Sequence, residues 1–254
     1  MPYLGLTGPL AIAHRGGGQE NLENSRSAFE HALRLGFPVI ETDVHASSDG
    51  VLVVVHDPQL TRTTDFNYEV GSTEWATLSK VRLRNGDPLM RLEEFLELVG
   101  DSVRINLDPK ADASVGPVID ILKANRDLQE RVCLGSFETG RLRRLRTELP
   151  GVATSLGGTE IRSLVLASRS RLKLPRRSVA IAAQVPERAS RVRIVNQQFV
   201  DYVHDIGMDV HVWTVNERED MHRLLDMGVD GLMTDRPTVL REVLEARGQW
   251  RDAT

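Results

Sequence analysis

The chain has 254 residues, of which 41% are hydrophobic and 27% are charged, and its formal net charge is −4. This length suits a single α/β barrel or two small domains, and the composition is that of an ordinary globular protein. The negative net charge excludes a general basic surface for nucleic acid, so a site for an anion has to be local. No stretch approaches the roughly 18 uninterrupted apolar residues of a membrane-spanning helix, so we expect no integral membrane segment.

The cysteine content and the first residues bear on the compartment. Cys133 is the single cysteine of the sequence, which permits no disulfide within the chain and fits a reducing compartment. Residues 1–17 lack the basic region with which a secretory signal begins. We therefore expect a cytoplasmic protein. The sequence does not indicate an oligomeric state.

A short apolar stretch at residues 10–13 predicts the first buried strand, which ends on His14 and Arg15. Three glycines follow at 16–18, and because glycine has no Cβ they allow close approach of the backbone to a ligand. Taken alone, this pair favours a core histidine and a surface ion pair over a functional site.

Residues 39–57 bring several reactive side chains together locally. Glu41 and Asp43 are separated by one residue in a predicted strand, so their side chains point to the same face. An Asp-Gly turn follows, and the aliphatic run at 51–55 returns antiparallel and leads to His56. A solvated acidic face of a strand pair is the alternative for this stretch.

Residues 57–91 are rich in turns and lack a regular strand–helix rhythm, so we predict an excursion that caps one end of the domain. The strand predicted next, at 103–110, carries Asp108 and Lys110 near its carboxyl end. An ordinary Asp-Lys surface pair is the alternative for these two residues.

Eight strands are predicted along the chain, over residues 10–13, 39–44, 103–110, 132–137, 151–156, 179–185, 209–215 and 229–234. Helices are predicted over residues 25–35, 91–99, 114–124, 139–148, 159–171, 196–206 and 217–227, and finally up to about residue 246. Eight such units predict an α/β fold, a (β/α)8 or TIM barrel, as one catalytic domain over residues 1–254. The active sites of such barrels lie at the carboxyl ends of the strands. Polar and aromatic residues fall at or near those ends: His14, Arg15, Glu41, Asp43, Asp108, Lys110, Trp213 and Asp235.

The acidic residues of this set suggest a metal site. Glu41, Asp43 and Asp108 offer three hard oxygen ligands, which suit one divalent cation, Mg²⁺ or Ca²⁺. Zinc is not favoured, because no cysteine or histidine cluster has the spacing of a zinc site.

The basic residues and the histidines of this set suggest what kind of ligand binds and how it reacts. Arg15 and Lys110 place positive charge beside the expected cation, so an anion such as phosphate is the natural ligand. His14 and His56 come from different strands, and histidine exchanges a proton near neutral pH. Because no serine elbow is present and Cys133 lies early in its strand, the set predicts metal-assisted cleavage of a phosphoester without a protein nucleophile.

With these residues in place, the chain resembles the glycerophosphodiester phosphodiesterase family. The resemblance covers residues 13–237 in family order and spacing. The matching segments are AHRGG at 13–17, LENS at 22–25, AF at 28–29, ETDVHASSDG at 41–50, VVHDPQLTRTTD at 54–65, NLDPK at 106–110, SF at 136–137, VWTVN at 212–216 and GVDGLMTDRP at 228–237. It implies a barrel enzyme that uses a divalent cation to hydrolyse small-molecule glycerophosphodiesters to sn-glycerol 3-phosphate and an alcohol.

The resemblance also implies roles for individual residues, by their positions in the matching motifs. His14 and His56 would be the acid–base pair; Glu41, Asp43 and Asp108 would hold the metal; Arg15 and Lys110 would bind phosphate; and Trp213 would line the glycerol side.

Three departures from the family pattern stand out. The family usually has Pro-Glu-Asn-Thr where this chain has Leu-Glu-Asn-Ser at 22–25. Asp108 stands where the family usually has Glu, one methylene longer, which leaves the metal preference open. The basic loop at 169–177 matches nothing in the family pattern, and it favours a solvated linker over a nucleic-acid patch.

Two other functions remain open at this point. One is a phospholipase D-like lyase acting on sphingomyelin or lysophospholipids, a class that is typically secreted and disulfide-bonded. The other is a non-catalytic metabolite-binding barrel, for which an acid–base pair of histidines would have no use.

Overall fold

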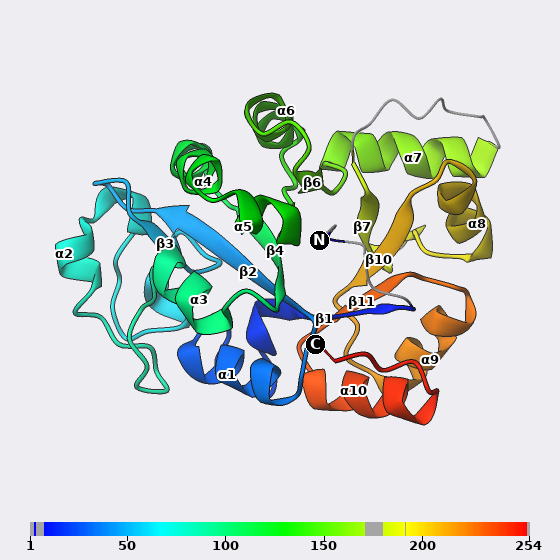
Figure 1. The fold of residues 1–254 in the computed structure, drawn as a ribbon, viewed down its shortest axis with the longest axis horizontal. Coiled ribbons are helices and arrows are strands. Elements are labelled where there is room, and N and C mark those ends of the chain that lie inside the picture. The colour runs from blue at the N-terminus through cyan, green and yellow to red at the C-terminus, as the bar shows by residue number, and fades with distance from the viewer. Residues whose placement is uncertain (1–2, 4–7, 171–179, 191, 253–254) are drawn as a thin grey trace.

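The computed structural model describes residues 3, 8–170, 180–190 and 192–252. Eight parallel strands form a ring in the order β6-β5-β4-β2-β1-β11-β10-β7, and a parallel bridge between Ser155 and Ala182 joins its two ends. The ring is a nearly closed barrel with helices between its strands (Figure 1), so the predicted TIM barrel is confirmed. Its strands are β1 (Leu10–Ala13), β2 (Val39–Ala46), β4 (Arg104–Pro109), β5 (Val132–Leu134), β6 (Ala153–Thr154), β7 (Ala182–Pro186), β10 (Asp209–Trp213) and β11 (Gly231–Thr234).

Six of the eight predicted strands are shorter in the structure than the sequence pattern suggests, and three of these six lie in the middle of the chain. Those three are the strands predicted over 132–137, 151–156 and 179–185, and residue 179 lies outside the described residues. Beyond the observed ends of the first two, Gly135 and Ser155 still donate backbone hydrogen bonds to a neighbouring strand, and Ser136, Phe137 and Leu156 line a cavity. An apolar run predicts burial equally well in both situations, which is why the pattern overestimates the pairing.

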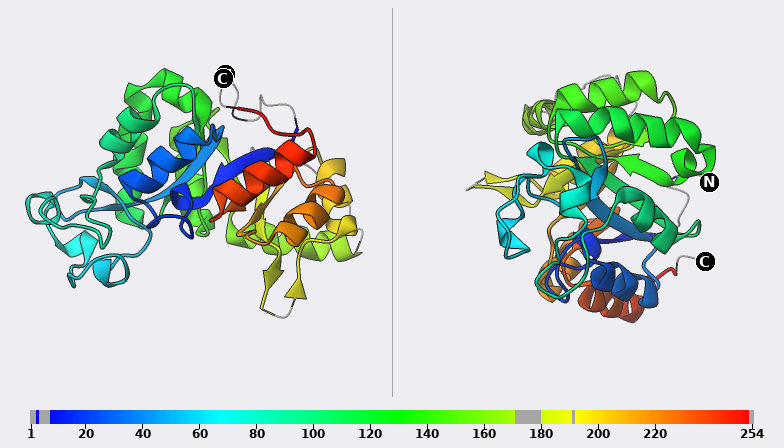
Figure 2. Two further views of the ribbon diagram at one scale, coloured as in Figure 1. Left: turned by 90° about the horizontal axis from the view of Figure 1, so that it is seen from below. Right: turned by 90° about the vertical axis from the view of Figure 1, so that its left-hand side faces the viewer.

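The helices surround the barrel, and its main hydrophobic core lies between them and the outer face of the sheet (Figures 1 and 2). They are α1 (Arg26–Arg34), α3 (Leu92–Val99), α4 (Asp112–Ala124), α5 (Arg126–Arg131), α6 (Thr139–Glu148), α7 (Gly158–Ser170), α8 (Gln197–Asp205), α9 (Arg218–Asp226) and α10 (Pro237–Ala246). Ser25 caps α1 by accepting a hydrogen bond from the backbone N–H of Ala28 at 3.2 Å. The sequence pattern does not predict helix α5; the Asn125 side chain caps it by accepting from the N–H of Leu128 at 3.0 Å.

Strand alternation separates the two sides of the sheet. In β1, Leu10 and Ile12 belong to a cluster with Cys133 and Met233, whereas Ala11 and Ala13 belong to the core under the helices. The barrel interior thus contains this apolar cluster and also the hydrogen-bonded side chains of Asn106, Gln184 and His211. Within the described residues, no helix is long and apolar enough to cross a membrane.

The predicted hairpin is present. Strand β3 (Leu52–Val54) pairs antiparallel with the end of β2, with Val44 opposite Val54, and the turn between them contains Gly50 at φ +85°. The segment 57–91 follows, with two 3₁₀ turns, η2 (Leu60–Arg62) and η3 (Val70–Ser72), and the short helix α2 (Trp75–Leu78). Six buried side chains of this segment form a separate hydrophobic cluster with Val53 of β3 and Val55: Leu60, Val70, Leu78, Val81, Leu83 and Leu89. In Figure 1 this segment lies at one end of the molecule, around α2.

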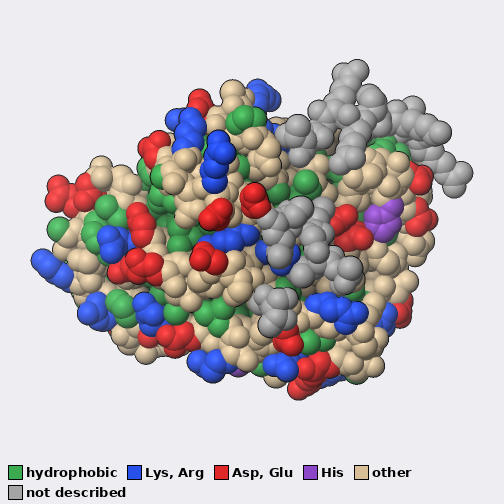
Figure 3. Space-filling view, viewed as in Figure 1, with side chains coloured by type: hydrophobic (Ala, Val, Ile, Leu, Met, Phe, Trp, Pro, Cys, Tyr) green, Lys and Arg blue, Asp and Glu red, His purple; other side chains and the backbone are tan. Residues whose placement is uncertain are grey.

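A second hairpin, which the sequence pattern does not predict, follows β7. Its strands β8 (Arg188–Ala189) and β9 (Val192–Arg193) project from the body of the molecule (Figure 2, left). The predicted basic loop at 169–177 overlaps α7 only at Arg169 and Ser170, and the rest of it lies outside the described residues. On the face drawn in Figure 3, Lys and Arg side chains are interspersed with Asp and Glu.

Candidate active site

A cavity of about 420 Å³ lies at the carboxyl ends of the barrel strands. Its volume is within the range of small-molecule sites, about 300–1,000 Å³. All eight side chains predicted for the site line it: His14, Arg15, Glu41, Asp43, His56, Asp108, Lys110 and Trp213. Parallel strands deliver them to one place because all their carboxyl ends meet at the same end of the barrel.

The turn after β1 places His14 and Arg15. Arg15 adopts a left-handed conformation with φ +52°, and its backbone N–H donates to Oε2 of Glu41 at 3.0 Å. A Cβ on Gly16 would lie 2.9 Å from Ala28, and one on Gly17 would lie 2.7 Å from Pro237. Glycine is therefore required at these two positions for close packing against Ala28 of α1 and Pro237 of α10, and the approach of a ligand to their backbone stays a prediction.

His14 is held by a carboxylate that directly follows the last strand of the barrel. Its Nδ1 lies 2.6 Å from Oδ1 of Asp235, whose other oxygen accepts from Nδ2 of Asn216 at 3.1 Å. Burial by itself would lower the pKa of His14, but the charge of Glu41 and the hydrogen bond to Asp235 outweigh it and raise the pKa above its ordinary value. His14 therefore retains its proton at a higher pH than an exposed histidine does.

His56 has the same kind of partner, supplied by the next residue in the chain. Its Nδ1 lies 2.6 Å from Oδ1 of Asp57. In each imidazole Nδ1 is bonded to a carboxylate, so Nε2 is the nitrogen that can exchange a proton with a bound substrate. Both histidines line the same cavity, so the structure presents two oriented imidazoles to one site.

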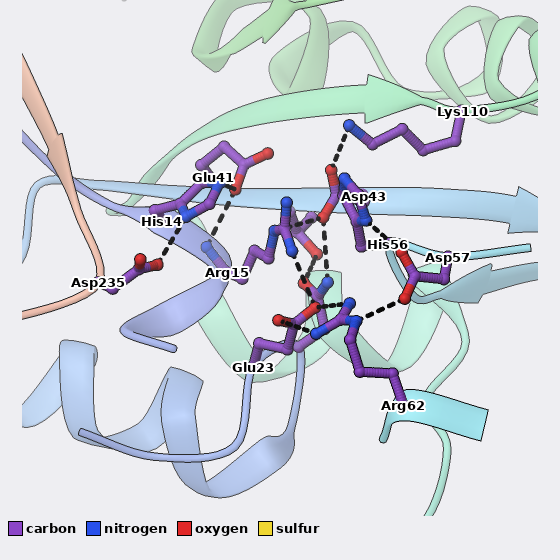
Figure 4. A network of polar contacts seen from close by, with 12 residues as sticks. His14, Arg15, Glu23, Glu41, Asp43, His56, Asp57, Arg62, Lys110 and Asp235 are labelled. Atoms are coloured by element: carbon purple, nitrogen blue, oxygen red, sulfur yellow. Dashed lines mark hydrogen bonds and ion pairs between the residues drawn. The ribbon is translucent and has the colours of Figure 1, made fainter. Parts of the chain in front are cut away.

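The three carboxylates of the cavity, Glu41, Asp43 and Asp108, differ in how many partners they have; Figure 4 shows the first two. Asp43 is the most enclosed: Arg15 Nε lies 3.2 Å from its Oδ2, Asn24 donates to the same oxygen at 3.1 Å, and Lys110 Nζ lies 2.9 Å from its Oδ1. Lys110 also donates to Oδ2 of Asp108 at 2.6 Å, whereas the buried Oδ1 of Asp108 has no hydrogen-bond partner among the described residues.

The protonation of these carboxylates follows from burial and from their neighbours. Burial and the charge of Asp43 raise the pKa of Glu41 to about 7. Burial would also raise the pKa of Asp43, but the charges of Lys110 and Arg15 overcome it and lower that pKa. Burial raises the pKa of Asp108. Burial therefore makes Glu41 and Asp108 easier to protonate than free carboxyl groups, whereas Asp43 is kept ionised by its two cationic neighbours.

These residues fit a divalent cation in donor type and in charge. Carboxylate oxygens are the preferred ligands of Mg²⁺ and Ca²⁺, and the raised pKa of Glu41 marks a place where added positive charge is favourable. The geometry is less complete, because no group of three His, Cys, Asp or Glu side chains in the described part of the chain is arranged to hold a metal. The ammonium of Lys110 bridges Asp43 and Asp108 in their present positions.

An apolar wall faces the charged side of the cavity. Trp213 packs edge-on against Phe137, with their ring centroids 5.6 Å apart, and Phe137 remains 64% exposed at the mouth. Ile161 of α7 and Ile194, next to the second hairpin, line the same cavity.

The residues that hold the two histidines and Arg15 are mostly ones to which sequence reasoning assigns no role. Asp235 stands out in the sequence by its position at a strand end and within a matching segment, but it lies 221 positions from His14 in the chain. Asp57 adjoins His56, which is a usable local signal. Glu23 and Arg62, both within matching motifs, take part in the network of Figure 4, but no sequence spacing links them.

Comparison with known proteins then decides the family. A family model described as "Glycerophosphoryl diester phosphodiesterase family" matches residues 14–239. The chain belongs to this family. The family is enzymatic, and its members are phosphoric diester hydrolases that generally depend on a divalent metal.

Individual relatives agree with this assignment. This phosphodiesterase is 38% identical over 259 residues to "Probable glycerophosphodiester phosphodiesterase 2" of Mycobacterium tuberculosis, covering 100% of this chain and 97% of that protein. A solved structure from Silicibacter pomeroyi matches with a TM-score of 0.82 at 24% identity and covers 98% of each chain. A phosphodiesterase from Oleispira antarctica, solved with the product sn-glycerol-3-phosphate, matches with a TM-score of 0.78 at 21% identity over 94% of this chain and 97% of that one.

Proposed function

We propose that this phosphodiesterase hydrolyses glycerophosphodiesters to sn-glycerol 3-phosphate and a free alcohol, with His14 and His56 as its acid–base pair. The observation that carries the proposal is the pair of imidazoles in one cavity, each with Nδ1 on a carboxylate and Nε2 left for the guest. The product bound by the Oleispira antarctica phosphodiesterase supports the same substrate class.

The phosphate would be bound by the cationic side chains of the cavity. Arg15 has a planar fork suited to two phosphate oxygens, and Lys110 supplies a compact second charge. Trp213 would contact the glycerol carbons. Glu41, Asp43 and Asp108 would hold one divalent cation, Mg²⁺ or Ca²⁺, which when bound neutralises phosphate charge and makes the phosphorus more electrophilic.

The two histidines would divide the proton transfers. His56 would take the proton of the glycerol 2-hydroxyl, whose oxygen then bonds to phosphorus and closes a five-membered ring. As the bond from phosphorus to the leaving alcohol breaks, His14 would donate its proton to the alcohol oxygen. Water would then open the cyclic phosphate with the two histidine roles reversed. The raised pKa of His14 supports its assignment as the initial acid.

The first test is product formation. With Mg²⁺ or Ca²⁺ supplied, we expect glycerophosphocholine to yield sn-glycerol 3-phosphate and choline, and EDTA to remove the activity. Diesters of ethanolamine, inositol and glycerol, assayed in parallel, rank the alcohol preference. Binding without product release would instead support a metabolite-binding barrel, and accumulation of a cyclic phosphate would support a lyase.

The second test concerns the attacking oxygen. A glycerophosphodiester that lacks the 2-hydroxyl should turn over at least about 100-fold more slowly at saturating concentration, because the advantage of an intramolecular attack is lost. It should still inhibit hydrolysis of the normal substrate competitively, which confirms that it binds. Near-normal turnover of the analogue would exclude the cyclic route and identify water as the attacking nucleophile.

We also propose that the protein acts in the cytoplasm, where the single cysteine would stay reduced. Fractionation of the source cells with an antibody against the protein measures this directly. Recovery of the protein outside the cytoplasmic fraction would contradict it.

A further inference from the structure

We propose that Arg62 is a positioning residue for catalysis, which holds the carboxylate partner of His56 in place from the segment 57–91. The inference rests on the proposed function of His56 and goes beyond it by assigning a task to a side chain that need not touch the substrate. Arg62 belongs to η2 and does not line the cavity.

The contacts of Arg62 are directed at two carboxylates. Its Nε donates to Oδ2 of Asp57 at 2.5 Å, while Nη1 and Nη2 donate to the two oxygens of Glu23 at 2.6 and 2.8 Å. All three nitrogens of the guanidinium are therefore used, and the pair with Glu23 is bidentate (Figure 4). The planar fork fixes the two carboxylates relative to each other.

Each of these carboxylates also contacts a side chain that lines the cavity. Oδ1 of Asp57 lies 2.6 Å from Nδ1 of His56, and Oε1 of Glu23 accepts from Nη1 of Arg15 at 3.0 Å. A continuous line of hydrogen bonds thus runs from His56 through Asp57, Arg62 and Glu23 to Arg15. Figure 4 shows this line lying beside the Asp43 carboxylate.

The two ends of the line depend on Arg62 to different degrees. Arg15 contacts Glu23, Asp43 and, through its backbone N–H, Glu41, and none of these three contacts is made by Arg62 itself. Asp57, in contrast, has only Arg62 and His56 as side-chain partners among the described residues. Removing Arg62 should therefore loosen His56 much more than Arg15.

The position of Arg62 is itself well determined. Arg84 donates to the carbonyl oxygens of Thr61, Arg62 and Thr64, which fixes the backbone of the turn that carries Arg62. The Arg62 side chain is 47% exposed, and exposed ion pairs add little to folding stability. Arg62 therefore contributes little to folding stability, and its several hydrogen bonds are better explained by a role in orienting Asp57.

The experiment compares Arg62→Met with Arg82→Met in the full chain. Arg82 is an exposed arginine of the same segment, and its guanidinium donates to the carbonyls of Ser79 and Val81. Arg62→Met should lower kcat by roughly 10-fold to 100-fold with little change in KM, as expected for a displaced catalytic group. Arg82→Met should leave both constants unchanged, and both variants should keep the melting temperature of the parent. Arg62→Lys, which keeps the charge but loses the fork, should recover part of kcat.

A double-mutant cycle with His56→Asn separates this inference from the proposed function. If Arg62 acts through His56, adding Arg62→Met to His56→Asn should cost less than about 3-fold, because the group that it positions is already absent. An equal loss in both backgrounds would overturn the inference while leaving the catalytic role of His56 intact. Normal activity of His56→Asn alone would overturn the proposed function first, and this inference with it. If Arg62→Met does not fold, the same cycle with Arg62→Lys decides the question.

Discussion

Replacement of His14 or His56 by Asn should lower kcat/KM by roughly 10²–10⁴-fold, the usual contribution of a positioned acid or base. Asparagine preserves a polar side chain of similar reach but cannot exchange a proton near neutral pH. Both imidazoles face one cavity, and each is fixed through Nδ1 by a carboxylate, so loss of either interrupts the same proton transfer.

The double replacement should cost less than the product of the two single losses, since one missing partner already disables the pair. A matched control is His204→Asn, because His204 also pairs with a carboxylate, Asp230, at 2.7 Å but does not line the cavity. Steady-state kinetics of the three single variants and the double variant measures this. Strictly multiplicative losses would contradict a common mechanism and mean that the two histidines act independently.

The second large effect is expected at the metal-binding carboxylates. Glu41→Gln should weaken Mg²⁺ or Ca²⁺ binding by more than about 100-fold, since even partners behind the direct ligands contribute about 10-fold to 100-fold. It removes one charged oxygen while keeping the shape of the side chain, and an amide oxygen can still accept from the N–H of Arg15. Titration calorimetry with each ion measures the affinity directly. Unchanged binding of both ions would remove Glu41 from the set of ligands.

The same variant should weaken metal binding but stabilise the metal-free protein at high pH. Burial and the charge of Asp43 raise the pKa of Glu41 from 4.5 to about 7, so between these values the folded state binds more protons than the unfolded state. The stability contributed by protonated Glu41 is therefore fully present below about pH 4.5 and is lost as the pH rises through 7. In EDTA, Glu41→Gln should melt at a higher temperature than the parent at pH 8 and at the same temperature at pH 4.5. Glu148→Gln, an exposed partner of Lys123, is the control for charge removal alone. A Glu41→Gln variant that melts lower than the parent at pH 8 would contradict this account of the empty site.

Local sequence patterns determine the barrel architecture and which residues line the cavity. Apolar runs of strand length alternate with helical periodicity, and this alternation alone implies parallel strands with crossover helices. Once the strands are parallel, residues that directly follow or end them must meet at one end of the barrel, which is why the sequence alone suffices to group His14, Asp43 and Asp108. The spacing of two residues within a strand likewise places Glu41 and Asp43 on one face.

The partnerships within the cavity are decided only by the tertiary structure. The hydrogen bond between His14 and Asp235, the fork from Arg62 to Glu23 and the position of Lys110 between two aspartates depend on how distant segments are brought into register. Periodicity fixes which face a side chain occupies, but it contains no information about which side chain from another strand or loop lies opposite. That choice is made when the barrel closes and burial selects the pairing that leaves the fewest charges without a partner.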